Sequence, residues 1–286
     1  MGSPRDAIAA ARHTLVRSGV AAAEARVDAE VLARHVLGWD RARLLTNGRD
    51  PAPPNFQDAF DALLRRRGAR EPVAQILGRR EFWGLDFDLT PDVLIPRPET
   101  EILVEEAIDF AGGHPCRLVI DVGTGSGCIA VAVAHALPVT RVIAIDASLP
   151  ALDVARRNVT NHDVADRITC RHGDVLAGVS ETADLILSNP PYVPDADAAT
   201  MQAEVVRFEP HAALFGGADG LDIMRRLMRQ APTRLASGGR LVVEFGFGQE
   251  AGVRALAGKS GWEILRIRED LQGIPRAAVL IRAATA

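Results

Sequence analysis

The spacing of apolar residues divides the chain into a helical first part and a second part in which strands and helices alternate. In residues 6–16, 24–37 and 56–64, apolar side chains recur every three to five positions, which is typical of helices that bury one face. The second of these segments stops at Gly38, and a glycine directly after a periodic stretch favours a helix end. We therefore expect residues 1–79 to form a small helical bundle.

Residues 80–96 are expected to link this bundle to the rest of the chain. Polar and apolar residues alternate over 80–89 around Gly84, which indicates a β-hairpin. Pro96 and Pro98 then keep the backbone extended, because each proline fixes its own φ and restricts the residue before it. The second domain is expected over residues 97–286, beginning with an amphipathic helix.

From residue 117 onward, short apolar runs typical of buried strands alternate with helical stretches. The runs are 118–122, 142–145, 168–171, 185–187, 241–245, 264–267 and 277–281, and the helical stretches are 129–137, 151–159 and 221–235. Such alternation predicts a mostly parallel sheet with helices on both faces. No helix separates the last two strands, so they should close the sheet as an antiparallel hairpin. The expected fold class is α/β with a Rossmann-like sheet.

Composition and charge narrow the function classes. The 286 residues carry a net charge of −4, and 48% are hydrophobic, which is ordinary for a globular protein. Residues 1–90 hold 14 arginines against 12 acidic residues, whereas the rest of the chain holds 19 basic and 25 acidic residues. An acidic second half argues against a broad nucleic-acid-binding surface.

The three cysteines, Cys116, Cys128 and Cys170, form no C-x-x-C pair. A disulfide scaffold or a cysteine-rich zinc site is therefore not expected, and we find no metal-ligand spacing among the histidines. The first residues lack the apolar run of a signal peptide, and no stretch is long enough to span a bilayer. We expect a cytoplasmic protein without membrane association.

The first predicted strand ends in a glycine-rich loop, Asp121-Val122-Gly123-Thr124-Gly125-Ser126-Gly127. Glycines here let the backbone approach a nucleotide and open a helix N-terminus toward it. Asp146 ends the second strand and could accept both ribose hydroxyls, which fits NAD and S-adenosylmethionine equally. Asp174 follows the third strand and is a candidate for the adenine amino group, although a loop-initiating role fits as well.

After the fourth predicted strand the chain reads Asn189-Pro190-Pro191-Tyr192, at the strand end where α/β sheets bind ligands. The prolines hold Asn189 and Pro190 extended. The Asn189 side-chain oxygen and the Pro190 carbonyl then form two fixed acceptors, which is what a planar NH2 group needs to be held by both hydrogens. Tyr192 offers a flat face on which that group can stack.

This combination resembles the N-P-P-Y motif of S-adenosylmethionine-dependent amino-group methyltransferases. DNA adenine, ribosomal RNA guanine and protein glutamine methyltransferases use similar tetrapeptides. Over nearly the whole chain, the sequence resembles the HemK-like release-factor glutamine methyltransferases. The matching stretches are 71–78, 82–84, Pro-Arg-Pro-Glu-Thr-Glu at 96–101, 121–127, 189–192, 209–210 and 213–221. Val175 departs from the aromatic residue that some relatives place against adenine, and Leu94 and Ile95 stand where some relatives carry a phenylalanine.

The resemblance implies a class I methyltransferase fold, S-adenosylmethionine as cofactor, and a peptide chain release factor as protein substrate. The methylated atom would be the side-chain amide nitrogen of the glutamine in the Gly-Gly-Gln loop. The cofactor contacts implied are Asp121, Gly123, Thr124, Gly125, Ser126, Gly127, Asp146, Asp174, Val175 and Asn189. The catalytic and substrate contacts implied are Asn189, Pro190, Pro191 and Tyr192.

Several alternatives stay open at this point. The helical bundle is either a docking module for the release factor or purely structural, and His211 is a candidate substrate contact. Another amino-group methyltransferase, acting on a ribosomal-protein glutamine, DNA adenine or ribosomal RNA guanine, would share the tetrapeptide. A non-catalytic S-adenosylmethionine-binding module would have no need of an intact Asn189-Pro190-Pro191-Tyr192. We expect no direct nucleic-acid substrate and no metal.

Overall fold

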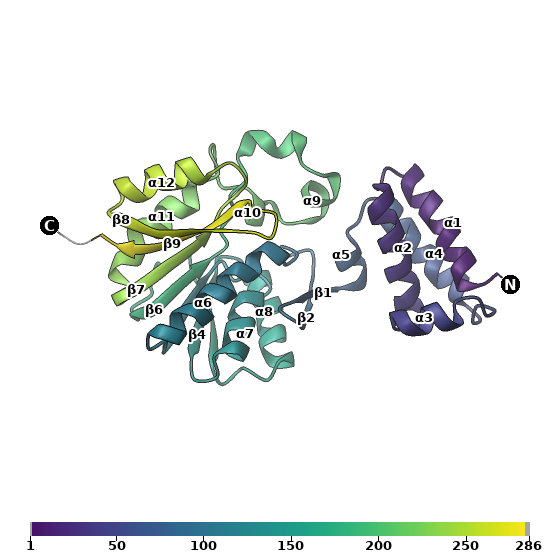
Figure 1. Ribbon diagram of the computed structural model, residues 1–286, viewed down its shortest axis with the longest axis horizontal. Coiled ribbons are helices and arrows are strands. Elements are labelled where there is room, and N and C mark those ends of the chain that lie inside the picture. Colours follow the sequence, from purple (N-terminus) through teal and green to yellow (C-terminus); the bar gives the residue numbers. More distant parts are fainter. Residues whose placement is uncertain (1, 284–286) are drawn as a thin grey trace. The chain divides into compact units, whose positions relative to one another are not determined.

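A computed structural model of the protein describes residues 2–283 as two compact units (Figure 1). The first unit contains the residues up to Arg79 together with Gln202–Phe208. The second contains Arg80–Met201 and the residues from Glu209 onward. Each unit has a hydrophobic core of its own.

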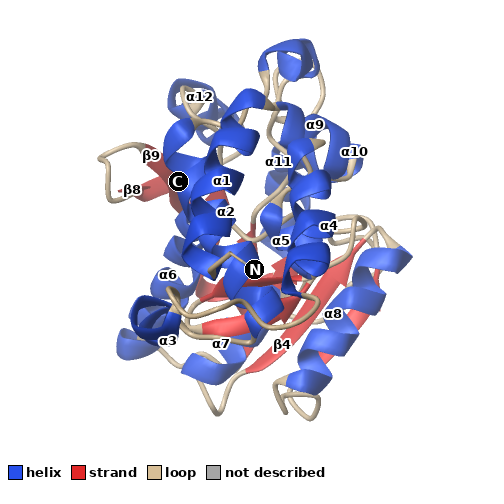
Figure 2. Ribbon diagram, turned by 90° about the vertical axis from the view of Figure 1, so that its right-hand side faces the viewer, coloured by secondary structure: helices blue, strands red, loops and turns tan. Residues whose placement is uncertain are grey.

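The first unit is all-helical, as Figure 2 shows by colour, and its helices surround a core that includes Leu15, Leu32 and Phe60. Its helices are α1 (Pro4–Arg17), α2 (Ala22–Leu37), α3 (Arg41–Asn47), α4 (Phe56–Gly68), α5 (Val73–Leu77) and α9 (Ala203–Phe208). The helix α2 ends at Gly38 as predicted, because Gly38 adopts a left-handed φ of 61°. The short helices α3 and α5 were not predicted, since segments of seven and five residues carry little periodicity.

One segment corrects the predicted domain limits. Gln202–Phe208 was assigned to the second domain but belongs to the helical unit. The buried carboxylate of Glu204 accepts hydrogen bonds from Arg67 at 3.0 Å and from Arg70 at 2.6 Å, and the Gln75 amide donates to the Phe208 carbonyl at 2.6 Å. Buried charges need such partners. Because Arg67 and Glu204 lie 137 positions apart, no local pattern reveals the pair.

The second unit contains a seven-stranded sheet of order β5-β4-β3-β6-β7-β9-β8. Its strands are β3 (Leu118–Val122), β4 (Arg141–Asp146), β5 (Ile168–His172), β6 (Ala183–Ser188), β7 (Leu235–Glu244), β8 (Trp262–Glu269) and β9 (Pro275–Arg282). The first five strands run parallel, and β9 is antiparallel to both β7 and β8. The α/β prediction and the closing antiparallel hairpin are confirmed. A separate small sheet pairs β1 (Arg79–Phe82) with β2 (Leu85–Asp88), which is the predicted hairpin.

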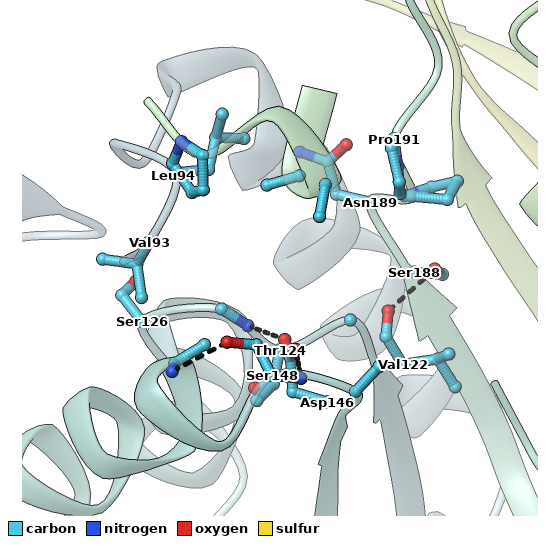
Figure 3. Close-up of a pocket in the computed structure, with 18 of the residues that line it drawn as sticks. Val93, Leu94, Val122, Thr124, Ser126, Asp146, Ser148, Ser188, Asn189 and Pro191 are labelled. Atoms are coloured by element: carbon cyan, nitrogen blue, oxygen red, sulfur yellow. Dashed lines mark hydrogen bonds between the residues drawn. The ribbon is translucent and has the colours of Figure 1, made fainter. Parts of the chain in front are cut away.

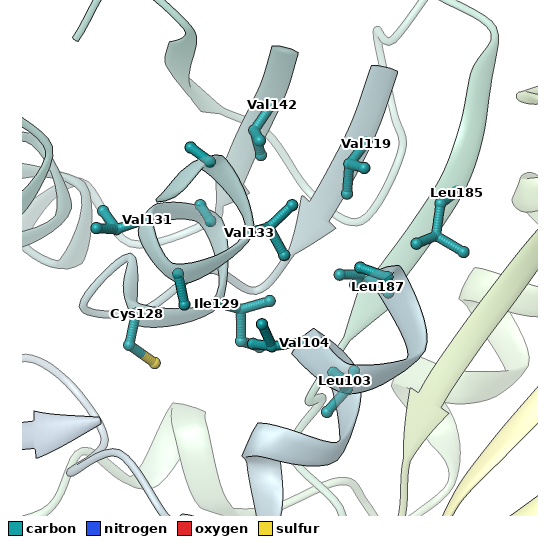
Figure 4. Packing of buried hydrophobic residues seen from close by; sticks show 14 of the residues in the cluster. Leu103, Val104, Val119, Cys128, Ile129, Val131, Val133, Val142, Leu185 and Leu187 are labelled. Atoms are coloured by element: carbon teal, nitrogen blue, oxygen red, sulfur yellow. The ribbon is translucent and has the colours of Figure 1, made fainter. Parts of the chain in front are cut away.

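Helices cover both faces of the large sheet. On one face, α6 (Glu101–Gly113) and α7 (Cys128–Ala136) bury Leu103 and Ile129 among strand residues (Figure 4), and α8 (Leu149–Asn161) adds Val159. On the other face lie α11 (Asp222–Gln230) and α12 (Glu250–Lys259). The short helix α10 (His211–Leu214) precedes α11 in the chain. The parallel strands therefore end at one edge of a covered sheet, where ligands bind in this class of fold.

The helix predicted over 221–235 is shorter in the structure. The helix α11 ends at Gln230, a 3-10 turn covers Ala231–Thr233, and β7 already begins at Leu235. Pro232 explains the change, because it has no N–H to continue the helical hydrogen bonds. Among residues 2–283, no helix is long and apolar enough to cross a membrane.

Candidate active site

A cavity of about 320 Å³ lies at the carboxyl edge of the parallel strands (Figure 3). The glycine-rich loop follows β3, Asp146 ends β4, Asp174 follows β5, and Asn189 follows β6, so the sheet brings the predicted motifs together. Ten of the predicted site residues line the cavity: Gly123, Thr124, Gly125, Ser126, Asp146, Asp174, Val175, Asn189, Pro190 and Pro191. Asp121, Gly127 and Tyr192 do not line it.

The glycine-rich loop owes its course to left-handed backbone angles. Gly123, Gly125 and Gly127 have φ values of 75°, 55° and 80°, which side chains rarely adopt. A Cβ on Gly127 would lie 3.2 Å from the Ala155 Cβ, so this glycine lets α7 start close to α8. The position of Gly127 therefore serves helix packing, whereas Gly123 and Gly125 face the cavity.

Asp146 is held rigidly by the backbone around it. Its Oδ2 accepts the Gly125 N–H at 2.8 Å, and its Oδ1 accepts the Ser148 N–H at 2.8 Å (Figure 3). Each carboxylate oxygen keeps a further lone pair for a hydroxyl donor. The predicted ribose-binding acid thus stands at a fixed angle on the cavity wall.

Asp121 lies beneath the glycine-rich loop, fully buried. One of its oxygens accepts the Thr124 hydroxyl at 2.6 Å, and the other has no hydrogen-bond partner among the described residues. Burial raises the pKa of Asp121 to about 7. This geometry supports the loop through Thr124 and gives Asp121 no direct face on the cavity.

The residues around the predicted adenine site are arranged less tightly. Asp174 lines the cavity, but its carboxylate is also paired with Arg226. Val175 is buried on the wall with a left-handed φ of 58°. Leu94 lines the cavity, whereas Ile95 does not, and the Ile95 N–H donates to Glu209 at 3.1 Å.

His211 does not line the cavity, although its chain neighbours Pro210 and Ala212 do. It begins α10. Its ring meets the Phe215 ring edge-on, with centroids 5.4 Å apart.

Asn189 lines the cavity and carries an acceptor without a hydrogen-bond partner among the described residues. Its amide NH2 donates to the Thr100 hydroxyl oxygen at 3.0 Å. Its side-chain oxygen Oδ1 is buried and has no hydrogen-bond partner among the described residues. A buried carbonyl oxygen without a donor costs free energy, so a ligand that brings an N–H to this position would be favoured.

The tetrapeptide lies against the backbone of Gly216 and Gly220 and against the side-chain amide of Gln249. A Cβ on Gly216 would lie 2.4 Å from the Pro191 carbonyl oxygen, and one on Gly220 would lie 2.0 Å from the Tyr192 carbonyl oxygen. The Gln249 amide donates to the same Tyr192 carbonyl at 2.8 Å. Burial also raises the pKa of the Tyr192 phenol. The glycines of stretch 213–221 are therefore needed for close approach to the tetrapeptide.

Several residues that line or support the cavity were not predicted as site residues from the sequence. Thr100 and Arg97 line the cavity, and the buried Glu209 carboxylate binds Arg97 and the Ile95 N–H. The stretch at 96–101 was noticed, but nothing local indicates that Thr100 meets Asn189, 89 positions away. The lining residues that were not predicted as site residues also include Asp92, Val93, Pro96, Val122, Cys128, Ile129, Ala147, Ser148, Ala151, Gly173, Ser188, Pro210, Ala212, Ala213 and Ile223.

Comparison with known proteins matches both parts of the chain. Residues 6–78 match the PrmC N-terminal domain, and residues 99–214 match the methyltransferase small domain. The release factor glutamine methyltransferase of Cereibacter sphaeroides is 44% identical over 271 residues, which cover 95% of each chain. The chain belongs to the release factor glutamine methyltransferase family. The family member from Bordetella pertussis is likewise 44% identical, over 88% of this chain and 93% of its own.

Solved structures confirm the class I methyltransferase fold. The catalytic domain of hMettl16, determined with an RNA hairpin, matches with a TM-score of 0.59 and 19% identity, over 78% of this chain and 82% of its own. A methyltransferase from Pyrococcus furiosus matches with a TM-score of 0.52 and 18% identity, over 78% of this chain and 98% of its own. At these identities the likeness concerns the fold alone.

The cavity residues fit S-adenosylmethionine, the methyl donor of this family. Asp146 offers fixed oxygens to ribose hydroxyls, and the glycine-rich backbone admits a nucleoside close to β3. Arg97 is the only basic side chain among the described residues that line the cavity, and its guanidinium is also paired with Glu209. No group of three or more potential metal ligands occurs among residues 2–283.

Proposed function

We propose that the chain transfers a methyl group from S-adenosylmethionine to the side-chain amide nitrogen of the glutamine in the Gly-Gly-Gln loop of peptide chain release factors. The observation that carries this proposal is that Asn189 lines the cavity and that its buried side-chain oxygen has no hydrogen-bond partner among the described residues. An oxygen held in this way accepts an N–H, and a primary amide brings one. The names of the close relatives support the same substrate.

The chemistry required of the protein is mainly alignment. An amide nitrogen is a poor nucleophile because its lone pair is delocalised, whereas S-adenosylmethionine supplies a methyl group on a positively charged sulfur. The Asn189 oxygen and the Pro190 carbonyl accept the two hydrogens of the amide and so fix the direction of its nitrogen. Their partial negative charges stabilise the positive charge that develops on nitrogen as the N–CH3 bond forms and the S–CH3 bond breaks. The methylated nitrogen would then release one of its two hydrogens as a proton to water, which gives the neutral N-methyl amide.

The substrate loop suits a recessed acceptor pair. Two glycines before the target glutamine leave a backbone without side chains, which can bring the glutamine deep into a cavity. A single glutamine carries little information, so we assign recognition of the release factor body to the helical unit. The reaction then takes place in the cytoplasm, where release factors act. The acidic second half of the chain supports a protein rather than a nucleic-acid substrate.

The decisive experiment is mass spectrometry of a release factor incubated with the protein and S-adenosylmethionine. We expect one added methyl group on the loop glutamine, as N(5)-methylglutamine, and none when that glutamine is replaced. Asn189→Ala should abolish methylation, while Asn161→Ala, an asparagine outside the cavity, should not. DNA and ribosomal proteins are tested in parallel. Methylation of either of these, with none on the release factor, would refute the substrate assignment.

A further inference from the structure

The orientation of the Asn189 side-chain amide can be traced to two buried residues, Thr100 and Glu244. An asparagine amide has a donor end and an acceptor end of nearly equal shape, so it can occupy its place in two orientations. Only one orientation turns the oxygen to the ligand. In the structure the NH2 end is bound by Thr100, which is 2% exposed and ends the 3-10 turn Pro98–Thr100.

Glu244, the last residue of β7, is 2% exposed; burial raises the pKa of its carboxyl, and the neighbouring Thr100 hydroxyl opposes this rise. A hydroxyl has a single proton. When that proton goes to the Glu244 carboxylate, the Thr100 oxygen faces Asn189 with lone pairs only, and it can bind the NH2 end but not the oxygen. A Thr100 proton directed at Glu244 in this way would fix the orientation of Asn189.

The register of the sheet places Asn189 and Glu244 side by side. Ser188 of β6 pairs with Val243 of β7 in parallel register, so Asn189 and Glu244 each come one residue after this pair. Thr100 is contributed by the stretch at 96–101, between Pro98 and α6. Neighbouring strand ends and a proline-restricted turn are rigid supports, which favours a fixed hydrogen-bond chain.

We propose that Thr100 and Glu244 are positioning residues of the methyl transfer, which hold the Asn189 amide with its oxygen toward the substrate nitrogen. This inference rests on the proposed function, because it assumes that the substrate presents an NH2 group. In the opposite orientation the Asn189 NH2 would face the substrate NH2, donor against donor, and the substrate could not be held by that residue.

The proposed hydrogen-bond arrangement does not depend on the charge of Glu244. Burial raises the pKa of this carboxyl to about 7, with Glu99 adding to the rise and Arg276 and Arg97 opposing it. Its Oε2 has no hydrogen-bond partner among the described residues. A proton can reside on that oxygen while the other oxygen continues to accept from Thr100.

Two substitutions of Thr100 separate positioning from packing. Thr100→Val keeps the side-chain shape but removes the hydroxyl, so we expect kcat to fall about tenfold or more, as for other misaligned reacting groups. The dissociation constant of the cofactor should stay within about threefold, because the orientation of Asn189 chiefly affects the substrate. Thr100→Ser restores the hydroxyl and should restore most of kcat. Glu244→Met, which removes the acceptor, should lower kcat in the same way.

Thr140→Val is the matched control. Thr140 is equally buried, and its hydroxyl donates to the Cys116 carbonyl at 2.7 Å outside the cavity. It should lower thermal stability without lowering kcat. The proposal is overturned if Thr100→Val keeps kcat within twofold of the wild type, or if Thr140→Val lowers kcat as much as Thr100→Val does.

A measurement without substrate distinguishes this inference from the proposed function. In NMR spectra of the protein alone, the Asn189 side-chain NH2 should exchange slowly with solvent in the wild type and Thr100→Ser, and faster in Thr100→Val. If the wild type fails to methylate release factors but shows this protection pattern, the substrate is wrong and the positioning stands. Equal exchange in wild type and Thr100→Val would refute the positioning.

Discussion

Asp146 and Asn189 both stand at strand ends on the cavity, but the structure binds their side chains in opposite ways. Both Asp146 oxygens accept backbone N–H groups at 2.8 Å, whereas the Asn189 oxygen has no partner among the described residues. The first residue is therefore fixed before any ligand binds. The second is fixed only through its NH2 end, which leaves the oxygen for the ligand.

The fixed carboxylate leads to a prediction about cofactor affinity. Asp146→Ala removes charged acceptors for the ribose hydroxyls, and hydrogen bonds to charged groups contribute about 1.5–3 kcal/mol. We expect the dissociation constant of S-adenosylmethionine to rise roughly ten- to a hundredfold. Isothermal titration calorimetry measures this directly. Asp153→Ala is the control, because Asp153 is an exposed acid of α8 outside the cavity. An unchanged affinity in Asp146→Ala would exclude it from the cofactor site.

At the scale of the element, the spacing of apolar residues predicted the strands of the large sheet and most of the longer helices. Buried strands such as 118–122 were predictable because a parallel sheet covered on both faces requires continuous apolar runs. The helix over 221–235 was overextended because apolar periodicity continued across Pro232, and α9 was assigned to the wrong unit because its partners Arg67 and Arg70 are remote in sequence.

In the candidate site, too, contiguous motifs could be predicted from the sequence, whereas contacts between remote residues could not. The glycine-rich loop and the Asn189-Pro190-Pro191-Tyr192 tetrapeptide are contiguous, and their chemistry was readable from the sequence. Thr100, Glu244 and Gln249 were missed as functional residues, because each acts on the tetrapeptide from another element. Asp121 was expected to contact the cofactor, but burial beneath the loop is visible only in three dimensions.

The close approach of the 213–221 stretch to the tetrapeptide gives a testable prediction. Gly220→Ala places a Cβ 2.0 Å from the Tyr192 carbonyl oxygen, at a φ of 76°. The tetrapeptide must shift, and misplacement of reacting groups by about 1 Å can lower rates a hundredfold. We expect at least a tenfold loss of kcat/KM in the release factor assay, by analogy with such displacements.

Gly248→Ala provides the control for backbone strain. Gly248 has a similar φ of 79°, but a Cβ there meets no atom within 4 Å. The variant should lose about 1–2 kcal/mol of stability from the left-handed backbone angle and keep its activity. Equal loss of activity in both variants would show that strain, not the contact with Tyr192, is responsible.

At the scale of the whole molecule, the cavity belongs to one of the two units. All the described residues that line the cavity belong to the second unit. The helical unit contributes none of them, yet residues 6–78 match a domain of their own within the same family. A domain that adds nothing to the cofactor cavity is suited to recognise the substrate protein, which agrees with the docking role proposed above.

This division predicts how the enzyme treats a short peptide and a complete release factor. The wild type should methylate the full-length factor with a much higher kcat/KM than a Gly-Gly-Gln peptide, because the peptide lacks the body that the helical unit would bind. In a variant without residues 1–79, kcat/KM should fall for the full-length factor but not for the peptide. The two substrates should then be methylated with similar kcat/KM. The affinity of this variant for S-adenosylmethionine, measured by calorimetry, should stay near the wild-type value and so serves as the control for folding. If the truncated protein binds the cofactor and still strongly prefers the full-length factor, recognition resides in the second unit, and the helical unit is structural.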